Sequence, residues 1–168
     1  LAPGHADLHH NLGNTWLSFD RADRALPPLL EACRLDPAHL RAHTDLGSAY
    51  KDSGELSRAM EVGSRAVEID GQSADAHWNL SLARLMDGQL SAGFEGYEWR
   101  RQIPDMRVQK FAQPDWSGGP LPGGTLLVHH EQGLGDGLQF LRFVEPLREK
   151  VGPDARLVWQ THPGLRAL

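Results

Sequence analysis

The chain has 168 residues, of which 40% are hydrophobic and 23% charged, and its formal net charge at pH 7 is −5. These values are typical of a soluble globular protein and exclude an intrinsically disordered chain, and the lack of a basic stripe argues against nucleic acid as the main partner. The apolar runs are too short to cross a bilayer, and no export signal opens the sequence. The single cysteine, Cys33, excludes an internal disulfide, and its apolar neighbours indicate a packed thiol. We therefore expect a cytoplasmic protein without a membrane span.

A repeat of 34 residues organises the first hundred residues. The same pattern of histidine, leucine and a small residue occurs in residues 9–16 (HHNLGNTW), 43–50 (HTDLGSAY) and 77–84 (HWNLSLAR). A second row of small residues follows at Ala25, Ala59 and Gly93. Small residues let two helix backbones approach closely, and an aromatic residue beside them fills the remaining space. The pattern therefore predicts two packed helices in each repeat.

Helix stops give the bounds of these predicted helices. Asp36-Pro37 and Ser53-Gly54 end a helix because proline cannot continue it and glycine accepts a positive φ. The first helix of each repeat, the A helix, is expected over residues 5–18, 39–52 and 73–86. The second, the B helix, is expected over residues 22–35, 55–69 and 90–102.

The repeat resembles the tetratricopeptide repeat, whose period is ~34 residues and whose pattern is W-x2-L-G-x2-Y, A-x3-F and a closing proline. The third copy matches less well, since core residues are replaced by Arg84, Gly93 and Arg100. The resemblance implies a mainly α fold, a helix-turn-helix solenoid that mediates protein–protein interaction. Its repeats would span about residues 5–37, 39–71 and 73–104. Residues 1–3 align with residues 35–37, so we expect the end of an earlier repeat there and a chain that is a piece of a longer array.

The A helices of such a solenoid line a concave surface that carries its binding function. One repeat position holds Asn11, Asp45 and Asn79. Amides that face a groove can bind the backbone N–H and C=O groups of an extended peptide of any sequence. Similar arrays often present such an asparagine ladder, which Asp45 interrupts here. Further candidates for this peptide groove are His10, Arg41, Trp78, Asp7, Thr44 and Asp75. The alternative is that all these polar residues form a solvated helix face.

Three histidines also share one repeat position, at His9, His43 and His77. Successive repeats are offset by about 8–10 Å or more, which is too far for one ion to bind all three at ~2 Å. We therefore expect no metal site. The histidines are expected to take the packing position that the repeat usually gives to tryptophan.

The composition changes after Arg101. Residues 105–124 are rich in proline and glycine, which predicts a connector. Residues 125–168 then contain the predicted strand TLLVHH, the glycine turn EQGLGDG, the apolar helix LQFLRFVEPLREK and the second strand RLVWQT. This βαβ unit implies a parallel, Rossmann-like α/β segment. Because two strands do not form a stable sheet alone, we expect the start of a larger α/β domain or a remnant that packs on the repeats.

The glycine turn matches neither common nucleotide-binding motif. Gly133-x-Gly135 follows a strand, but Leu138 stands where the dinucleotide fingerprint has its third glycine, and no acid ends the second strand. No Gly-Lys-Ser/Thr follows, as a nucleoside triphosphate loop requires. The turn therefore predicts neither nicotinamide nor triphosphate binding.

Residues 114–143 (PDWSGGPLPGGTLLVHHEQGLGDGLQFLRF), the helix GYEWR and the repeats resemble bacterial tetratricopeptide proteins with a C-terminal glycosyltransferase domain. That domain is similar to the heptosyltransferases of the GT-B fold. The resemblance implies that a Gly135-Asp136 turn lies in the cleft with Asp136 as catalytic base. The substrate loop would contain Glu131, Gly133 and Gly135. Since the nucleotide-sugar donor of that family binds mainly to the C-terminal half, we expect no cofactor in this chain and sugar transfer only by a full-length form.

Two functions follow from these patterns and from the resemblance. The first is the interaction module of an inverting glycosyltransferase, whose repeats recruit a protein or glycan acceptor and whose Asp136 takes the proton of the acceptor hydroxyl. The second is a non-enzymatic scaffold that binds extended peptides, in which the α/β segment is structural. Asp136 would then only cap the following helix, as aspartate often does.

Overall fold

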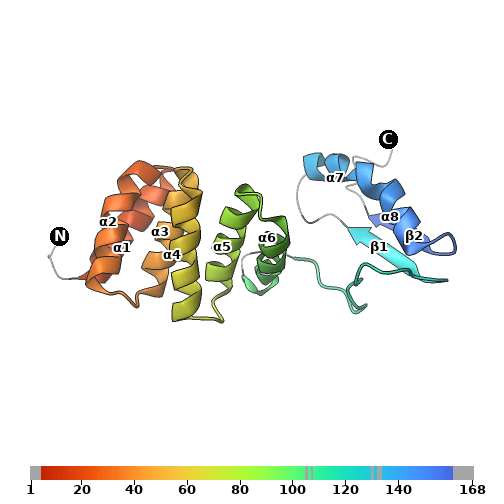
Figure 1. The fold of residues 1–168 in the computed structure, drawn as a ribbon, viewed down its shortest axis with the longest axis horizontal. Coiled ribbons are helices and arrows are strands. Elements are labelled where there is room, and N and C mark those ends of the chain that lie inside the picture. The colour runs from red at the N-terminus through yellow and green to blue at the C-terminus, as the bar shows by residue number, and fades with distance from the viewer. Residues whose placement is uncertain (1–4, 105, 107, 130, 132–133, 161–168) are drawn as a thin grey trace. The chain divides into compact units, whose positions relative to one another are not determined.

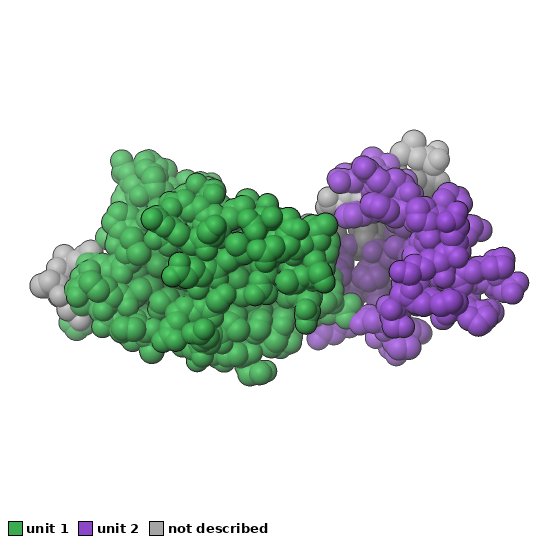
Figure 2. All heavy atoms as spheres, viewed as in Figure 1, with its two compact units in different colours: residues 1–106 green, residues 107–168 purple. Residues whose placement is uncertain are grey.

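The structure, a computed structural model, describes residues 5–104, 106, 108–129, 131 and 134–160. Of Leu134, Asp136 and Gly137 it describes the backbone alone. The chain forms two compact units, Leu1–Met106 and Arg107–Leu168, which Figure 2 shows in different colours. The division lies close to the change in composition that follows Arg101.

The first unit consists of paired antiparallel helices, as Figure 1 shows. The A helices are α1 (Ala6–Ser18), α3 (Leu40–Asp52) and α5 (Ala74–Met86). The B helices are α2 (Ala22–Leu35), α4 (Leu56–Ile69) and α6 (Leu90–Tyr97), and the 3₁₀ helix η1 (Glu98–Gln102) follows them. Each helix packs on the next one in the chain, and neighbouring A helices also contact one another. The predicted helix-turn-helix solenoid is therefore confirmed.

Small residues allow close packing in the core of this unit. Fully or nearly fully buried side chains come from both helix types, among them Ala25, Leu29, Leu46, Ala49 and Ala59. A Cβ atom added to Gly13 of α1 would lie only 2.4 Å from Cγ of Leu29 on α2. The glycine of the repeat pattern is thus needed for the approach of α1 to α2.

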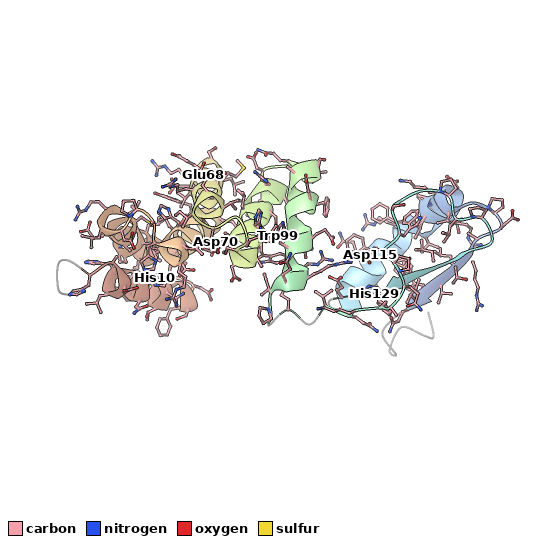
Figure 3. All side chains as sticks on the ribbon, turned by 90° about the horizontal axis from the view of Figure 1, so that it is seen from below. His10, Glu68, Asp70, Trp99, Asp115 and His129 are labelled. Carbon is pink, nitrogen blue, oxygen red and sulfur yellow. The ribbon has the colours of Figure 1, made fainter. Side chains whose placement is uncertain are left out.

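The recurring histidines fix the turns that precede the A helices. Nε2 of His43 lies 3.2 Å from the carbonyl oxygen of Pro37, and Nε2 of His77 lies 3.1 Å from that of Gly71. The same contact thus occurs at equivalent positions of two repeats. The His77 ring also stacks on Trp99, which Figure 3 labels, with 3.9 Å between ring centroids. These contacts give His43 and His77 a structural role.

We expect His43 to make the fold less stable in mild acid. Burial holds the pKa of His43 below its ordinary value, and its Nδ1 is buried without a hydrogen-bond partner among the described residues. A lowered folded-state pKa means that the unfolded chain binds more protons, so this stability is present above about pH 6.5 and is lost as the pH falls below it. Urea unfolding at pH 7.5 and 5.5 should show a smaller loss in His43→Gln than in the natural protein; an equal loss would contradict the assignment.

The end of the third repeat departs from the prediction. The last B helix was expected to reach residue 102, but α6 ends at Tyr97 and η1 takes its place. Glycine lowers helix stability, and a Cβ on Gly96 would lie 2.9 Å from Cβ of Ser81 on α5. Arg100 is 8% exposed and donates to the Tyr97 carbonyl and to Glu98. The arginine in this core position is therefore buried with its hydrogen bonds made.

The second unit contains a two-stranded parallel sheet and helices between its strands. Strand β1 (Thr125–His129) pairs with β2 (Arg156–Gln160), with Leu127 opposite Val158. The connection contains α7 (Leu134–Phe140), the 3₁₀ helix η2 (Leu141–Phe143) and α8 (Val144–Val151). The predicted βαβ order and parallel pairing are thus present.

The connection between the strands differs from the single helix expected to begin at Leu138. Its first helix starts at Leu134, so Gly135 and Asp136 lie in the first turn of α7 and form no separate turn before it. The 3₁₀ segment η2 interrupts the helix just before Pro146. Proline lacks the N–H that would bond four residues back and crowds that carbonyl, which accounts for the break.

No helix in the described part of the chain is both long enough and apolar enough to span a membrane.

Candidate functional site

The predicted groove residues lie on the three A helices. We call the side chains of Asp7, His10, Asn11, Asn14, Arg41, Asp45, Asp75, Trp78 and Asn79 the A-helix face. Asn11 is exposed and Asn79 is half-buried. Neither amide has a hydrogen-bond partner among the described side chains and backbone groups. Both amides are therefore available to a ligand.

Asp45 is the centre of a hydrogen-bonded cluster between α1 and α3. Its Oδ2 atom lies 2.8 Å from Nε2 of His10 and accepts a hydrogen bond of 3.0 Å from Nδ2 of Asn14. The side chain of His10 is 7% exposed and that of Asp45 is 22% exposed (Figure 3 labels His10). Asp45, which interrupts the predicted asparagine ladder, thus has a carboxylate whose orientation is fixed by His10 and Asn14.

A second contact between α1 and α3 joins Asp7 and His39. His39 is the N-cap of α3, and its Nδ1 accepts a hydrogen bond from the backbone N–H of Ala42. The proton of the neutral ring is therefore on Nε2, which lies 3.1 Å from Oδ1 of Asp7. The Asp7 side chain is 79% exposed, so this pair contributes little to stability.

The remaining predicted groove residues divide into free and packed side chains. Arg41 and Asp75 are exposed and have no ion-pair partner in the described part of the chain. Thr44 is buried and its hydroxyl donates to the Leu40 carbonyl. The Trp78 ring lies 4.5 Å from that of Tyr97, so part of its surface packs on the end of α6. Arg41 and Asp75 are thus open to a ligand, whereas Thr44 is not.

Two residues of this site were not predicted from the sequence. Asn14 lies three residues after Asn11, and that helical spacing would have placed it on the same face. His39 stands immediately before an A helix, where a side chain that accepts a backbone N–H is expected. The pairing of Asp45 with His10 joins residues 35 positions apart, and no local pattern indicates it.

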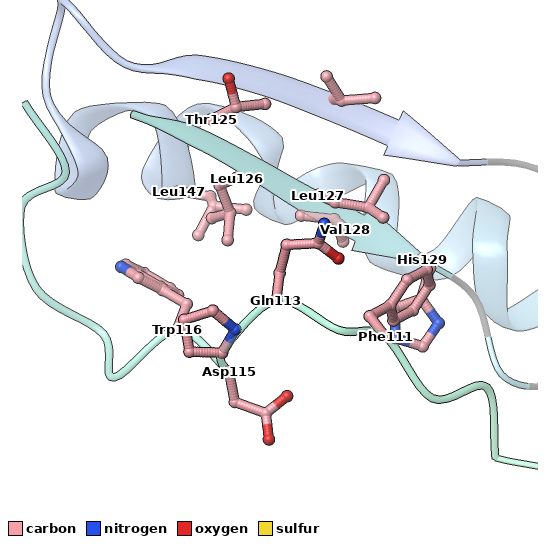
Figure 4. A pocket seen from close by; sticks show the side chains of 12 residues that line it. Phe111, Gln113, Asp115, Trp116, Thr125, Leu126, Leu127, Val128, His129 and Leu147 are labelled. Atoms are coloured by element: carbon pink, nitrogen blue, oxygen red, sulfur yellow. The ribbon is translucent and has the colours of Figure 1, made fainter. Parts of the chain in front are cut away.

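The second unit holds a cavity of about 730 Å³ along β1. Its walls include Phe111 and Trp116 from the connector, Leu126 and Val128 from β1, and Leu147 from α8. Figure 4 shows the Gln113 amide pointing toward the strand and the Asp115 carboxylate pointing away from it. Nδ1 of His129 is buried there without a partner in the described residues. Of the predicted substrate loop, the two residues that the structure describes, Glu131 and Gly135, do not line this cavity.

The predicted substrate loop is only partly described. Glu131 is exposed, and nothing lies within 4 Å of a Cβ built on Gly135. Gly133 and the side chain of Asp136 lie outside the described residues. Because α7 begins at Leu134, Asp136 is not the N-cap of this helix, contrary to the capping alternative. The base role of Asp136 stays a prediction.

Among the described residues, no three histidine, cysteine, aspartate or glutamate side chains are placed to hold a metal ion together.

Cys33 is expected to be unreactive in the folded protein. Burial, with a smaller contribution from Asp36, raises the pKa of its thiol to about 11. At pH 8 only about one thiol in a thousand is then a thiolate, the form that reacts. Ellman's reagent at pH 8 should therefore label the folded protein far more slowly than the protein in denaturant. Equal rates would show that the thiol is not protected.

The sequence matches no model of a known protein family and no curated protein. Its structure is similar to that of MamA from Desulfovibrio magneticus RS-1, with a TM-score of 0.55, 24% identity, and coverage of 62% of this chain and 61% of that chain. It is also similar to the first TPR domain of human RPAP3, with a TM-score of 0.57, 20% identity, and coverage of 61% and 81%. Helices α1 to α6 have the tetratricopeptide fold.

A third similar tetratricopeptide structure carries a ligand. It is the second TPR of Spaghetti (RPAP3), bound to the HSP90 peptide SRMEEVD, with a TM-score of 0.54 and 20% identity. The match covers 56% of this chain and 87% of that chain. At this level of identity the likeness concerns the fold alone, and a ligand of the present tetratricopeptide unit has to be inferred from its own residues.

Proposed function

We propose that the tetratricopeptide unit binds an extended segment of a partner protein across the A-helix face. The observation that carries this proposal is the pair of free amides, Asn11 and Asn79, on A helices at two ends of one row. Each amide offers one acceptor and two donors, which suits the backbone of an extended peptide. The similar tetratricopeptide unit of Spaghetti (RPAP3) is bound to a peptide, which supports peptide binding here.

Asn11→Ala and Asn79→Ala are each expected to weaken peptide binding about 2- to 10-fold, since a neutral hydrogen bond contributes ~0.5–1.5 kcal/mol. Isothermal titration calorimetry with peptides selected on the natural protein measures this change. Gln72→Ala, which removes an exposed amide from the turn before α5, is the matched control and should leave the affinity unchanged. If both face variants bind as the control does, the peptide does not use this row.

We further propose that the partner of the repeats is the acceptor in a sugar transfer. The resemblance of residues 114–143 to glycosyltransferase-like domains supports this, as does the parallel βαβ arrangement of β1, α7, α8 and β2. In such sheets the segment that follows the carboxyl end of a strand borders the binding crevice, and Gly135 and Asp136 belong to the segment that follows β1.

The chemistry assigned to this chain is a single proton transfer. The hydroxyl oxygen of the acceptor would attack the anomeric carbon of the donor, and the nucleotide would leave. The Asp136 carboxylate would take the proton of that hydroxyl during the attack. We assign no donor-binding residue to the described part of the chain. Sugar transfer by a form that includes a donor-binding half, with and without Asp136→Asn, tests the proposal. Peptide binding without any transfer would favour the scaffold function instead.

A further inference from the structure

The A-helix face carries more negative than positive charge. It contains the carboxylates of Asp7, Asp45 and Asp75 and one guanidinium, that of Arg41. The nearest further charges toward the end of α3, on Lys51 and Asp52, form an ion pair and offset each other. A ligand laid across the named side chains therefore meets three carboxylates and one guanidinium.

Asp45 is the best placed of these carboxylates for recognition. His10 and Asn14 both contact Oδ2, while Oδ1 has no hydrogen-bond partner among the described residues. The two contacts fix the carboxylate before a ligand arrives, so little side-chain entropy is lost on binding. Hydrogen bonds between a carboxylate and a cation are stronger than neutral ones, particularly when the carboxylate is partly removed from water. Oδ1 of Asp45 is thus a preoriented acceptor for a cationic group.

Asp75 on α5 is a second carboxylate that can bind a cationic group. It is exposed, has no ion-pair partner in the described part of the chain, and precedes Asn79 by one helical turn. An amide for the peptide backbone and a carboxylate for a side chain therefore lie on one face of one helix.

The charge of this face is opposite to what an acidic ligand requires. The peptide SRMEEVD, bound by the second TPR of Spaghetti (RPAP3), has three acidic residues and one arginine. Like charges across an interface reduce affinity, and opposite charges fix which partner binds. The same peptide on the A-helix face would place carboxylates near carboxylates.

We propose that the A-helix face selects an extended peptide that carries lysine or arginine, with one cationic side chain at Asp45 and another at Asp75. The inference rests on the proposed peptide-binding function and names the class of its ligand. It assigns Asp45 and Asp75 to side-chain recognition, whereas Asn11 and Asn79 bind backbone groups. Arg41 opposes such a ligand.

Selection from a library of random heptapeptides on the 168-residue chain tests the inference. The selected peptides should contain more lysine and arginine than glutamate and aspartate. A synthetic selected peptide should bind Asp75→Asn and Asp45→Asn roughly 3- to 30-fold more weakly, and its affinity should fall as salt is raised. Glu61→Gln on α4, an exposed acid away from the A helices, is the matched control and should change the affinity less than 2-fold.

One variant has an expected effect of opposite sign. Arg41→Gln removes the only unpaired cation of the A-helix face and should tighten binding of the cationic peptide about 2- to 5-fold. A variant that merely disturbed the fold would weaken binding. Tighter binding by Arg41→Gln would therefore show an effect of charge on the affinity rather than a loss of stability. Asp75 is exposed and unpartnered, so Asp75→Asn keeps the test valid even if Asp45→Asn unfolds the unit.

The outcomes separate this inference from the proposed function. Selected peptides that are neutral or acidic, or Asp75→Asn binding as Glu61→Gln does, would overturn the cationic preference and leave peptide binding standing. Failure of the library to yield any peptide would overturn peptide binding, and the inference with it.

Discussion

Replacing Leu29 by alanine is expected to lower the free energy of unfolding of the tetratricopeptide unit by about 2–5 kcal/mol. Leu29 is 0% exposed and is the largest of the fully buried side chains in the described part of the chain. Its removal leaves a cavity that the neighbouring alanines cannot fill. Leu30 is 46% exposed on the same helix, and Leu30→Ala, the matched control, should cost far less.

The close contact between Gly13 and Leu29 allows a second test of the same packing. Gly13→Ala places a methyl group 2.4 Å from Cγ and 2.7 Å from Cδ2 of Leu29, an overlap expected to cost ~1–3 kcal/mol. In the Leu29→Ala background the same methyl group enters vacated space. Urea unfolding of the single and double variants should therefore show a double variant that is more stable than additivity predicts. Additive losses, or equal losses for Leu29→Ala and Leu30→Ala, would contradict the described packing.

Asp136→Asn is expected to reduce the rate of sugar transfer by about 10²- to 10⁴-fold, the usual contribution of a general base. The amide has the same size as the carboxylate but cannot accept the proton of the acceptor hydroxyl. The measurement uses a form of the protein that includes a donor-binding half, with initial rates at saturating acceptor. The proposed base role predicts that kcat falls while KM for the acceptor changes little.

Asp154→Asn is the control for this variant, because Asp154 is an exposed acid in the turn before β2 of the same unit. It should keep the transfer rate within about 2-fold, as expected for a surface residue outside the reaction. If Asp136→Asn transfers sugar as fast as Asp154→Asn, Asp136 is not the base. The segment formed by β1 and α7 would then have a role other than supplying the base.

Much of the fold of the tetratricopeptide unit could be predicted because local and repeated signals agree. The A helices were predicted over 5–18, 39–52 and 73–86, and the structure has them from residues 6, 40 and 74 to the same ends. Asp36-Pro37 and Ser53-Gly54 stop the helices where expected. The prediction failed where tertiary packing decides, as at Gly96, which lies against Ser81 and is followed by a 3₁₀ helix.

The candidate site was predicted less completely than the fold. Asn11, Asp45 and Asn79 were placed on one face by the repeat period alone, and they do lie on neighbouring A helices. The sequence presented Asp45 as a gap in a ladder of amides, because its partners are 31 and 35 residues away. Contacts between separate helices depend on how the repeats stack, and no single repeat contains that information.

The second unit also contains packing contacts that the sequence did not predict. Residues 105–124 were predicted only as a connector, yet Phe111 and Trp116 line the cavity along β1. The indole N–H of Trp116 donates to the Gly119 carbonyl at 2.8 Å, and the backbone N–H of Leu121 bonds to Val151. Proline and glycine predict the absence of regular structure but not the absence of packing.

Mapping the bound peptide is the most direct test of peptide binding on the A-helix face. Amide hydrogen exchange of the 168-residue chain, with and without a selected heptapeptide, locates the surface. We expect added protection in α1, α3 and α5 around Asn11, Asp45 and Asn79, and little change in α2 and α4. Protection confined to the B helices or to the second unit would contradict the assignment of the A-helix face as the binding site.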